Sequence, residues 1–361
     1  MSLNLNKTSW RRVRFGEVVR NVTNTTRVPE SLGINRVVAM EHMDPSELKI
    51  ERWGDVADGT SFTRVVTPGQ TLFGKRRAYQ RKVAYAEFDA ICSSDIYTFE
   101  AIEGELVPAL LPFLVQSEGF FDHALGTSAG SLSPRTNWRD LADFEFALPP
   151  VSEQERFAEL LWAVERHRRS LATLVTALEH TLQPFIRSFT KNFPRLPLAD
   201  SAHMYQPRTI SAADLVEDGA YVVYGANGPM GRYTAFNHSH DEIAVACRGF
   251  TSGAVNWTKG PSWITGNSMV IQPTEGVSKR YLYWVLLLDA DLASAITGTT
   301  LRQITKKSIE SVVVPIPDRN QMDQVTSELE LLSDRLHQVQ NGERALNTLR
   351  ASLINDIFGD K

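Results

Sequence analysis

The feature that most constrains this chain is an internal repeat, because its second half carries the same succession of residue patterns as its first. The clearest match sets residues 136–149 (TNWRDLADFEFALP) against residues 304–317 (ITKKSIESVVVPIP). Apolar residues alternate in both copies, and each copy ends at a proline. This alternation predicts a short strand in each half, closed by proline.

The match continues upstream of these strands. Residues 110–125 and 281–297 are apolar and typical of helices, and Gly-Thr turns follow at Gly126 Thr127 Ser128 and Gly298 Thr299 Thr300. Earlier still, residues 67–88 and 239–257 each contain an apolar strand, a turn with cations and glycine, and a second strand. Each half is therefore predicted to be a mixed α/β unit.

Each half then passes into a long helix. Ser152 and Glu155 predict a capping box directly after Pro149 and Pro150. Apolar residues alternate at spacings of four and three along residues 157–189 and 322–357, which favours a coiled-coil seam over an ordinary bundle helix. Arg168 and Glu343 each occupy one slot of this pattern.

Two local sequences oppose long helices. Pro184 is predicted to kink or end the first helix near its last turns, because proline lacks the backbone donor that an α-helix needs. Asn341 and Gly342 are predicted to weaken the middle of the second helix.

Composition sets wider limits. The 361 residues are enough for two domains, with 42% hydrophobic and 22% charged residues as in ordinary globular proteins. The N-terminus lacks an apolar core of signal-peptide length, and the apolar runs at 107–115 and 281–288 are too short to span a bilayer, so we expect a soluble cytoplasmic protein. Cys92 and Cys247 are isolated and are expected to be buried small hydrophobes.

Several segments resemble enzyme motifs only by letter. Residues 126–130 (GTSAG) match a nucleophile elbow by letter, but the residues before Ser128 favour a helix where that motif needs a strand. The glycines of residues 225–231 resemble a phosphate loop, yet Asn227 Gly228 before Pro229 favours a tight turn. His238 and His240 are expected to be an exposed pair, and no metal site or cofactor is predicted.

The order of parts resembles the specificity subunit of type I restriction-modification systems. Three segments carry this resemblance: ALPPVSEQERFAELL at 147–161, YGANGPMGRY at 224–233 and EIAVACRGFTSGAV at 242–255. It covers nearly the whole chain, and its specificity lies in the arrangement because no single motif is diagnostic. The second junction, residues 314–325, departs from the pattern by lacking the double proline and the Glu-Gln pair of the first.

The resemblance implies an α+β fold in a pseudo-twofold repeat. Two mixed α/β target-recognition domains, at 1–150 and 193–317, would be separated by two long antiparallel coiled-coil helices at 151–192 and 318–361. It also implies a non-catalytic subunit that reads one half of a split double-stranded DNA target with each domain. Its partners would be two DNA methyltransferase subunits and motor-nuclease restriction subunits.

Candidate DNA-binding residues lie in two matching loops. Residues 75–82 hold five cations and no acid, and contribute Lys75, Arg76, Arg77, Tyr79, Gln80, Arg81 and Lys82. The matching loop contributes Arg248, Thr251 and Ser252, and the segments after the Gly-Thr turns add Arg135, Asn137, Arg302, Gln303 and Lys306. A solvated turn or a plain hairpin explains either loop without function.

Two other functions stay open at this point. A net charge of −4 argues mildly against nucleic acid and favours a coiled-coil protein-interaction scaffold without DNA binding. The recognition module of a related modification system, or a stand-alone recognition protein, shares the same sequence features.

Overall fold

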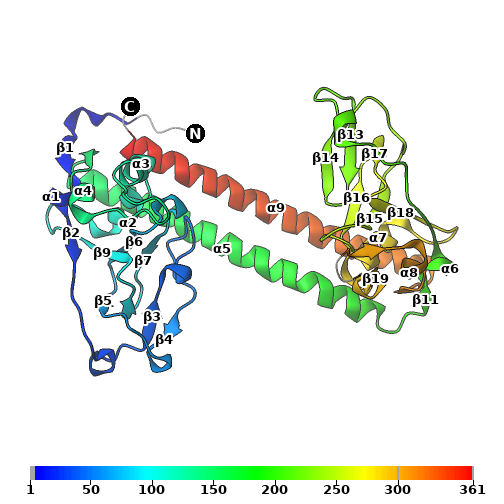
Figure 1. Ribbon diagram of the computed structural model, residues 1–361, viewed down its shortest axis with the longest axis horizontal. Coiled ribbons are helices and arrows are strands. Elements are labelled where there is room, and N and C mark those ends of the chain that lie inside the picture. Colours follow the sequence, from blue (N-terminus) through cyan, green and yellow to red (C-terminus); the bar gives the residue numbers. More distant parts are fainter. Residues whose placement is uncertain (1–4, 299–300, 360–361) are drawn as a thin grey trace. The chain divides into compact units, whose positions relative to one another are not determined.

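The computed structural model describes residues 5–298 and 301–359 and divides the chain into two compact units. Unit 1 comprises Met1–Leu171 with Gly342–Lys361, and unit 2 comprises Ala172–Asn341. Each unit combines sheets, short helices and parts of two long helices (Figure 1). The predicted α+β fold class is confirmed. The compact units nevertheless divide inside the long helices, and not at their ends.

Unit 1 contains two four-stranded sheets. The order in one is β2 (Val19–Val22), β9 (Ile96–Ala101), β6 (Thr71–Gly74) and β7 (Val83–Tyr85), and in the other β4 (Gly54–Asp55), β3 (Arg36–Val38), β8 (Ala90–Cys92) and β5 (Arg64–Val66). A separate antiparallel pair joins β1 (Arg11–Arg14) to β10 (Glu145–Leu148). The short helices are α1 (Phe15–Val18), α2 (Leu111–Val115), α3 (Glu118–Gly126) and α4 (Trp138–Ala142).

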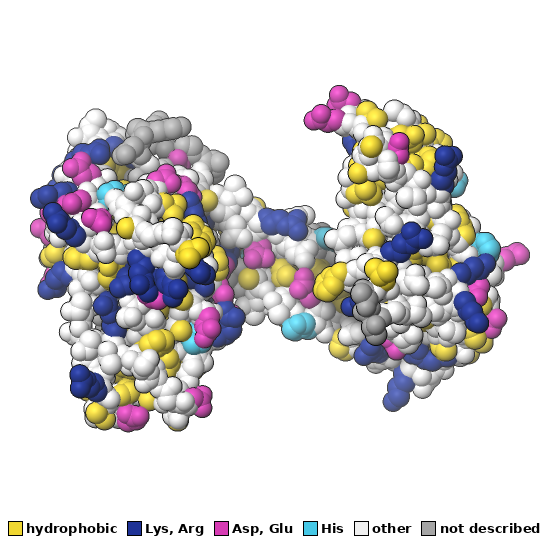
Figure 2. Space-filling view, viewed as in Figure 1, with side chains coloured by type: hydrophobic (Ala, Val, Ile, Leu, Met, Phe, Trp, Pro, Cys, Tyr) yellow, Lys and Arg dark blue, Asp and Glu magenta, His cyan; other side chains and the backbone are white. Residues whose placement is uncertain are grey.

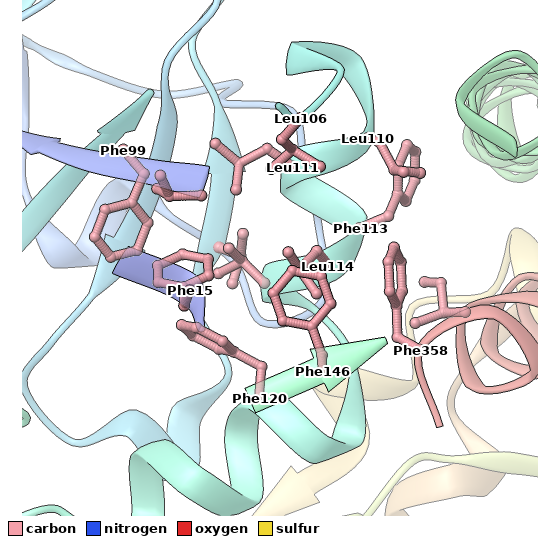
Figure 3. Close-up of a cluster of buried hydrophobic side chains, with 14 of the residues drawn as sticks. Phe15, Phe99, Leu106, Leu110, Leu111, Phe113, Leu114, Phe120, Phe146 and Phe358 are labelled. Atoms are coloured by element: carbon pink, nitrogen blue, oxygen red, sulfur yellow. The ribbon is translucent and has the colours of Figure 1, made fainter. Parts of the chain in front are cut away.

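The core of unit 1 is rich in phenylalanine, as Figure 3 shows. Phe15 from α1 and Phe120 from α3 lie with ring centroids 4.9 Å apart. Phe146 from β10 faces Phe358, which comes from the last turn of the C-terminal helix. The core therefore joins the start of the chain to its end, and the alternation predicted for residues 144–148 is confirmed by the burial of Phe144, Phe146 and Leu148.

Unit 2 repeats this plan with different residues. Its main sheet has the order β12 (Ala202–Tyr205), β18 (Ser268–Pro273), β15 (Glu242–Ala246), β16 (Val255–Thr258), and its second sheet β14 (Gly228–Tyr233), β13 (Tyr221–Gly225), β17 (Ser262–Ile264). Two further pairs join β11 (Arg195–Pro197) to β21 (Val313–Pro315) and β19 (Ile296–Thr297) to β20 (Gln303–Ile304). Its short helices are α6 (Leu198–Ser201), α7 (Lys279–Leu288) and α8 (Lys306–Glu310).

The internal repeat is therefore a repeat of topology. The order β2-β9-β6-β7 in unit 1 corresponds to β12-β18-β15-β16 in unit 2, and in each sheet the last two strands form the hairpin that the sequence predicted. The pair β1-β10 corresponds to β11-β21 in the same way. The second sheets differ in strand number, so the halves match most closely around the main sheet.

The long helices are α5 (Val151–Thr190) and α9 (Arg319–Phe358). The predicted capping box is wrong, because α5 begins at Val151 and places Ser152 inside the first turn. The carbonyl of Pro150 accepts hydrogen bonds from the backbone N–H groups of Glu153 and Gln154. Pro150 directly precedes the first helical residue and therefore occupies the N-cap position, so Ser152 cannot cap the helix.

Neither helix ends where its sequence is weakest. Pro184 lies inside α5, so the expected end of the helix there is wrong. Ile186 beyond it is fully buried in the core of unit 2, and this burial stabilises turns that proline disfavours. Helix α9 runs through Gly342, where an added Cβ would lie 3.2 Å from Cδ1 of Leu171. Glycine thus permits a close approach between the helices.

Within each unit the two helices run antiparallel. In unit 1 the first half of α5 shares a core with the last turns of α9, through Leu161 and Val164 on one side and Leu353 and Ile357 on the other. In unit 2 the last turns of α5 share a core with the first turns of α9. Opposite ends of the two helices therefore meet in each unit.

A buried ionic network occupies the helix seam in unit 1. Glu165 is fully buried, and its Oε1 accepts a hydrogen bond from Nη2 of Arg168 at 2.8 Å. Nε of Arg350 on α9 lies 3.0 Å from Oε2 of Glu165, and Arg168 also binds Glu47. Burial alone lowers the pKa of Arg168, but the hydrogen bonds to Glu165 and Glu47 outweigh it and raise that pKa. Arg168, which interrupts the apolar pattern of the helix, is therefore a buried charge paired with carboxylates.

We predict that Glu165→Leu destabilises unit 1 by about 3–5 kcal/mol, because it leaves two buried arginines without the carboxylate between them. Glu159→Leu is the matched control, since Glu159 is exposed on the same helix. Urea unfolding followed by circular dichroism measures both variants. Equal midpoints for the two would show that the network contributes nothing to stability.

Candidate nucleic-acid interface

The cationic loop of unit 1 joins β6 to β7 and is tied to a second segment of the chain. The backbone N–H of Arg77 donates to the carbonyl of Pro134 at 2.8 Å, and the backbones of Arg76 and Arg135 form an isolated antiparallel β-bridge. Arg77 and Arg81 both have left-handed backbones, with φ of 56° and 51°. These constraints fix the loop against residues 127–137 and bring together two sets of residues that the sequence placed far apart.

Asp95 gathers two of the predicted arginines. Its Oδ2 accepts from Nη1 of Arg76 at 3.4 Å, and its Oδ1 lies 3.2 Å from Nη2 of Arg135. Nε of Arg76 also donates to Oγ of Ser133 at 2.5 Å. Both guanidinium groups stay partly exposed, so they are oriented by the carboxylate and still accessible.

Lys75 lies behind these arginines. Its Nζ is 4.8 Å from the ring centroid of Tyr97. Burial lowers the pKa of Lys75, and the charges of Arg64 and Arg135 lower it further, while Asp95 acts in the opposite direction. Lys75 is thus a half-buried cation close to other positive charges.

Arg81 and Lys82 serve the structure of the loop itself. Arg81 makes a two-point ion pair with Glu118 on α3, with Nη1 2.6 Å from Oε1, and its guanidinium lies over the ring of Phe121. The pair raises the pKa of Arg81 and lowers that of Glu118. Nζ of Lys82 donates to the carbonyl of Met40 at 2.6 Å. Both cations are turned toward the protein.

The solvent-facing part of the loop is smaller than the sequence suggested. Among the residues that the structure describes, Arg77 makes no side-chain ion pair, and it is exposed together with Tyr79 and Asn137. Gln80 is half-buried and lines a hollow of about 340 Å³ with Ala39, Met40, Glu41, Arg76, Arg77, Ser93 and Asp95. Figure 2 shows lysine and arginine side chains gathered on the visible face of unit 1.

The matching loop of unit 2 is held in the same way. It joins β15 to β16, and the N–H of Gly249 donates to the carbonyl of Arg302 at 3.0 Å. The backbones of Arg248 and Gln303 form an antiparallel β-bridge, as those of Arg76 and Arg135 do. The loops and the segments after the Gly-Thr turns are therefore paired in both units. Thr299 and Thr300 of the second turn lie outside the described residues.

The side chains of this second loop divide into two groups. Arg248, Arg302 and Gln303 are exposed, Thr251 is half-buried, and Lys306 is exposed with its Nζ 3.9 Å from Glu310. Ser252 is buried, and its hydroxyl donates to the carbonyls of Gly249 and Arg302 at 2.8 and 3.2 Å. Ser252 thus holds the loop together.

Sequence reasoning missed the groups that orient the cations. Asp95 and Glu118 both lie outside the cationic run, and Asp95 stands one turn beyond β8. In unit 2 Asn267 takes the place of Asp95. The N–H of Cys247 donates to the carbonyl of Asn267 at 2.9 Å, just as the N–H of Lys75 donates to the carbonyl of Asp95. An alignment of the two halves that extends to Asp95 and Asn267 would have indicated this position.

The segments that resemble enzyme motifs have ordinary structural roles. Ser128 follows helix α3, and its hydroxyl donates to the carbonyl of Ala124 at 2.7 Å, so the strand-turn-helix of a nucleophile elbow is not formed there. Gly228, with φ of 94°, begins the second strand of the β13-β14 hairpin, in agreement with the predicted turn.

The histidine pair differs from expectation. His238 is buried, and its Nε2 lies 2.9 Å from the hydroxyl of Tyr205, so the prediction of an exposed pair is wrong for this residue. Burial lowers the pKa of His238. Cys92 and Cys247 are both buried, as predicted. Within residues 5–298 and 301–359, His, Cys, Asp and Glu side chains form no cluster suited to a metal ion.

Comparison with known proteins finds a family model that matches part of the chain. Residues 196–342 match the family model described as the type I restriction modification DNA specificity domain. The predicted resemblance to type I specificity subunits is confirmed. The type I restriction enzyme EcoDI specificity subunit of Escherichia coli is 30% identical over 122 residues, which are 31% of this chain. The match spans about a quarter, 26%, of that specificity subunit's length.

Two solved structures share the fold of this chain. The S subunit of a type I restriction-modification system from M. genitalium has a TM-score of 0.68 at 16% identity, with 99% of each chain covered. A chain from a study of complex assembly and conformational transition of the type I R-M system has a TM-score of 0.58 at 19% identity, covering 98% of this chain and 99% of that one. None of the helices in the described part of the chain combines the length and apolar character needed to cross a membrane.

We predict opposite shifts of the Lys75 pKa in two variants. Asp95→Asn should lower it further, because an attractive charge is removed, and Arg135→Ala should raise it, because a repulsive charge is removed. Titration of the lysine side chains by NMR measures both, with the Lys75 signal assigned by its loss in Lys75→Arg. Since this pKa lies below the unfolded value, the stability of the wild type should rise with pH between the two values. Shifts of the same sign in both variants would contradict the arrangement.

Proposed function

We propose that this chain is the non-catalytic, DNA-reading subunit of a type I restriction-modification enzyme, and that each unit reads one half of a split double-stranded target. The observation that carries this proposal is the equivalence of the two hairpin tips. Each tip is tied to the segment after a Gly-Thr turn, and each presents arginines to solvent. The specificity-domain match over residues 196–342 supports the role of the second tip directly.

The geometry of the tips suits the major groove. That groove admits a two-stranded β-ribbon, and both tips are ends of antiparallel hairpins, β6-β7 and β15-β16. An arginine at such a tip can donate two hydrogen bonds to guanine. Arg77 and Arg248 are the most exposed arginines of the two loops, so we assign base reading to them.

The remaining cations fit contact with phosphates. Arg76 and Arg135 are held by Asp95, and Arg302 and Lys306 lie beside the second tip. Phosphate contacts set the register of a protein on the duplex and carry no sequence information themselves. A chain with a net charge of −4 can bind DNA in this way because the cations are concentrated locally.

The proposal assigns catalysis to other subunits. Two DNA methyltransferase subunits and motor-nuclease restriction subunits would assemble on this chain, in the cytoplasm where the DNA lies. One of the similar structures comes from a study of complex assembly in a type I system, which supports partners of this kind. The chain itself would need no cofactor.

A selection from random duplexes tests the proposal. The purified chain, with its methyltransferase subunit, is incubated with the pool at fixed salt, and the bound duplexes are sequenced. The expected result is a split motif with an invariant gap. If the intact complex enriches no sequence, the DNA-reading function is overturned and a protein scaffold becomes the better account.

We predict that Arg77→Ala and Arg248→Ala each relax one half-site and leave the other unchanged. Loss of a two-point contact with guanine costs about 1–3 kcal/mol of discrimination at one position. Alanine tolerates the left-handed backbone of Arg77 no worse than arginine, so the loop should persist. Arg166→Ala, an exposed change on α5, is the control.

Quantitative binding at several salt concentrations separates the two kinds of contact. A residue that touches only phosphate weakens binding to all sequences and reduces the slope of log K against log salt by about 0.9. If Arg77→Ala shows neither a relaxed position nor a smaller slope, the first loop does not touch DNA.

We also predict that the helices set the permitted gap. A heptad inserted into both α5, after residue 171, and α9, after residue 341, preserves the apolar alternation of each helix. Seven residues add about 10 Å, or roughly three base pairs at about 3.4 Å each. Selection with this variant should return the same half-sites at a wider gap. An unchanged gap in a folded variant would contradict this role of the helices.

A further inference from the structure

Two apolar side chains protrude from the tip of unit 2. Phe250 is 90% exposed and Leu301 is 83% exposed, although both are large hydrophobic residues. Leaving a phenylalanine in water forgoes about 1.5–3 kcal/mol that burial would contribute. Their neighbours along the chain are Gly249 and Arg302, which are joined by a backbone hydrogen bond of 3.0 Å. The two apolar side chains thus flank one fixed point.

The backbone that carries Phe250 is well constrained. The N–H of Gly253 donates to the carbonyl of Ala246 at 2.9 Å, and that of Ala254 donates to the carbonyl of Thr251 at 2.9 Å. The buried hydroxyl of Ser252 adds bonds to both sides of the tip. A ring on such a support loses little conformational entropy when it meets a ligand.

Unit 1 shows the same combination at the equivalent place. Tyr79 on its hairpin loop is 56% exposed, and Leu132, close to Pro134, is 91% exposed. The hydrogen bond from Arg77 to Pro134 corresponds to that from Gly249 to Arg302. Exposed apolar groups beside exposed arginines therefore recur in both halves of the repeat.

We infer that Phe250, with Leu301, reads the methyl group of a thymine in the half-site bound by unit 2. This inference rests on the proposed DNA-reading function. In the major groove the C5-methyl of thymine is the apolar group that distinguishes one base pair from another, and phenylalanine is among the side chains that contact it. Arg302, beside the tip, would contact a flanking phosphate, and Arg248 would read a neighbouring guanine.

A protein partner is the competing occupant, and the surroundings of the tip disfavour it. The described neighbours of Phe250 along the chain are Arg248, Gly249, Thr251 and Ser252, so the apolar surface is narrow and bordered by a cation. The cores of protein interfaces are depleted in charge and continuous in apolar area. A narrow apolar point among cations fits a methyl group beside phosphates better.

The test uses duplexes that carry the selected target with each thymine replaced singly by deoxyuridine, which removes only the methyl. One replacement, in the half-site that Arg248→Ala relaxes, should weaken wild-type binding about four-fold. Phe250→Ala should bind the thymine and uracil duplexes equally. Phe250 is almost fully exposed, so alanine there removes no core contact and the variant should fold.

Phe236→Ala is the matched control. Phe236 is an exposed phenylalanine of unit 2 that packs on Tyr221 of β13, away from the arginine-bearing tip. This variant should keep the wild-type preference for thymine over uracil. Leu132→Ala should likewise leave the unit 2 half-site unaffected.

Four outcomes overturn the inference or the function on which it rests. If the wild type binds thymine and uracil duplexes equally, this residue does not read the methyl group. The same holds if Phe250→Ala keeps the wild-type preference for thymine. Wild-type discrimination in Phe250→Ala with loss of methyltransferase assembly assigns the tip to a protein partner. If the wild-type complex selects no duplex, the proposed function has failed and not the methyl contact alone.

Discussion

The candidate interface depends on backbone hydrogen bonds between a hairpin tip and a later segment, and one of these bonds recurs in both halves of the chain. In unit 1 it runs from Arg77 to Pro134, and in unit 2 from Gly249 to Arg302. Each bond ties a hairpin tip to a segment more than fifty residues later in the chain. Without it and the neighbouring bonds from Thr136 to Lys75 and from Ile304 to Cys247, the tip and the segment after the Gly-Thr turn would be two separate solvated loops. With it, they form one surface on which exposed cations and apolar side chains stand at fixed positions.

The two surfaces share a plan but differ in charge. Asp95 holds Arg76 and Arg135 in unit 1, whereas the amide of Asn267 occupies the corresponding place in unit 2. A carboxylate orients its arginines and also reduces their net attraction for phosphate. Unit 1 thus combines more cations with more internal pairing, and unit 2 has fewer cations that are freer. Under the proposed function, a repeat with such differences suits an asymmetric target, because each half would favour different bases.

The sequence was sufficient for the architecture because repetition and periodicity are local signals. The hairpins around residues 71–85 and 242–258 and the helices from Val151 and Arg319 followed from alternation, turns and apolar spacing. The effect of Pro184 did not follow, because burial of Ile186 by distant residues outweighs a local preference. The roles of Arg81 and Ser252 were equally hidden. Their partners, Glu118 and the carbonyl of Arg302, are neighbours only in the folded chain.

The slot held by Arg168 shows how a local irregularity can specify a fold. A charged residue in an apolar seam weakens a helix pair unless its partners lie opposite, and here Glu165, Glu47 and Arg350 meet it within unit 1. A shift of α9 by one turn along α5 would separate Arg350 from Glu165 and leave a buried charge unpaired. Apolar residues alone would tolerate such a shift, because leucines at regular spacing fit several registers. The network therefore favours a single register of the two helices, which is the property that a fixed gap between the proposed half-sites would require.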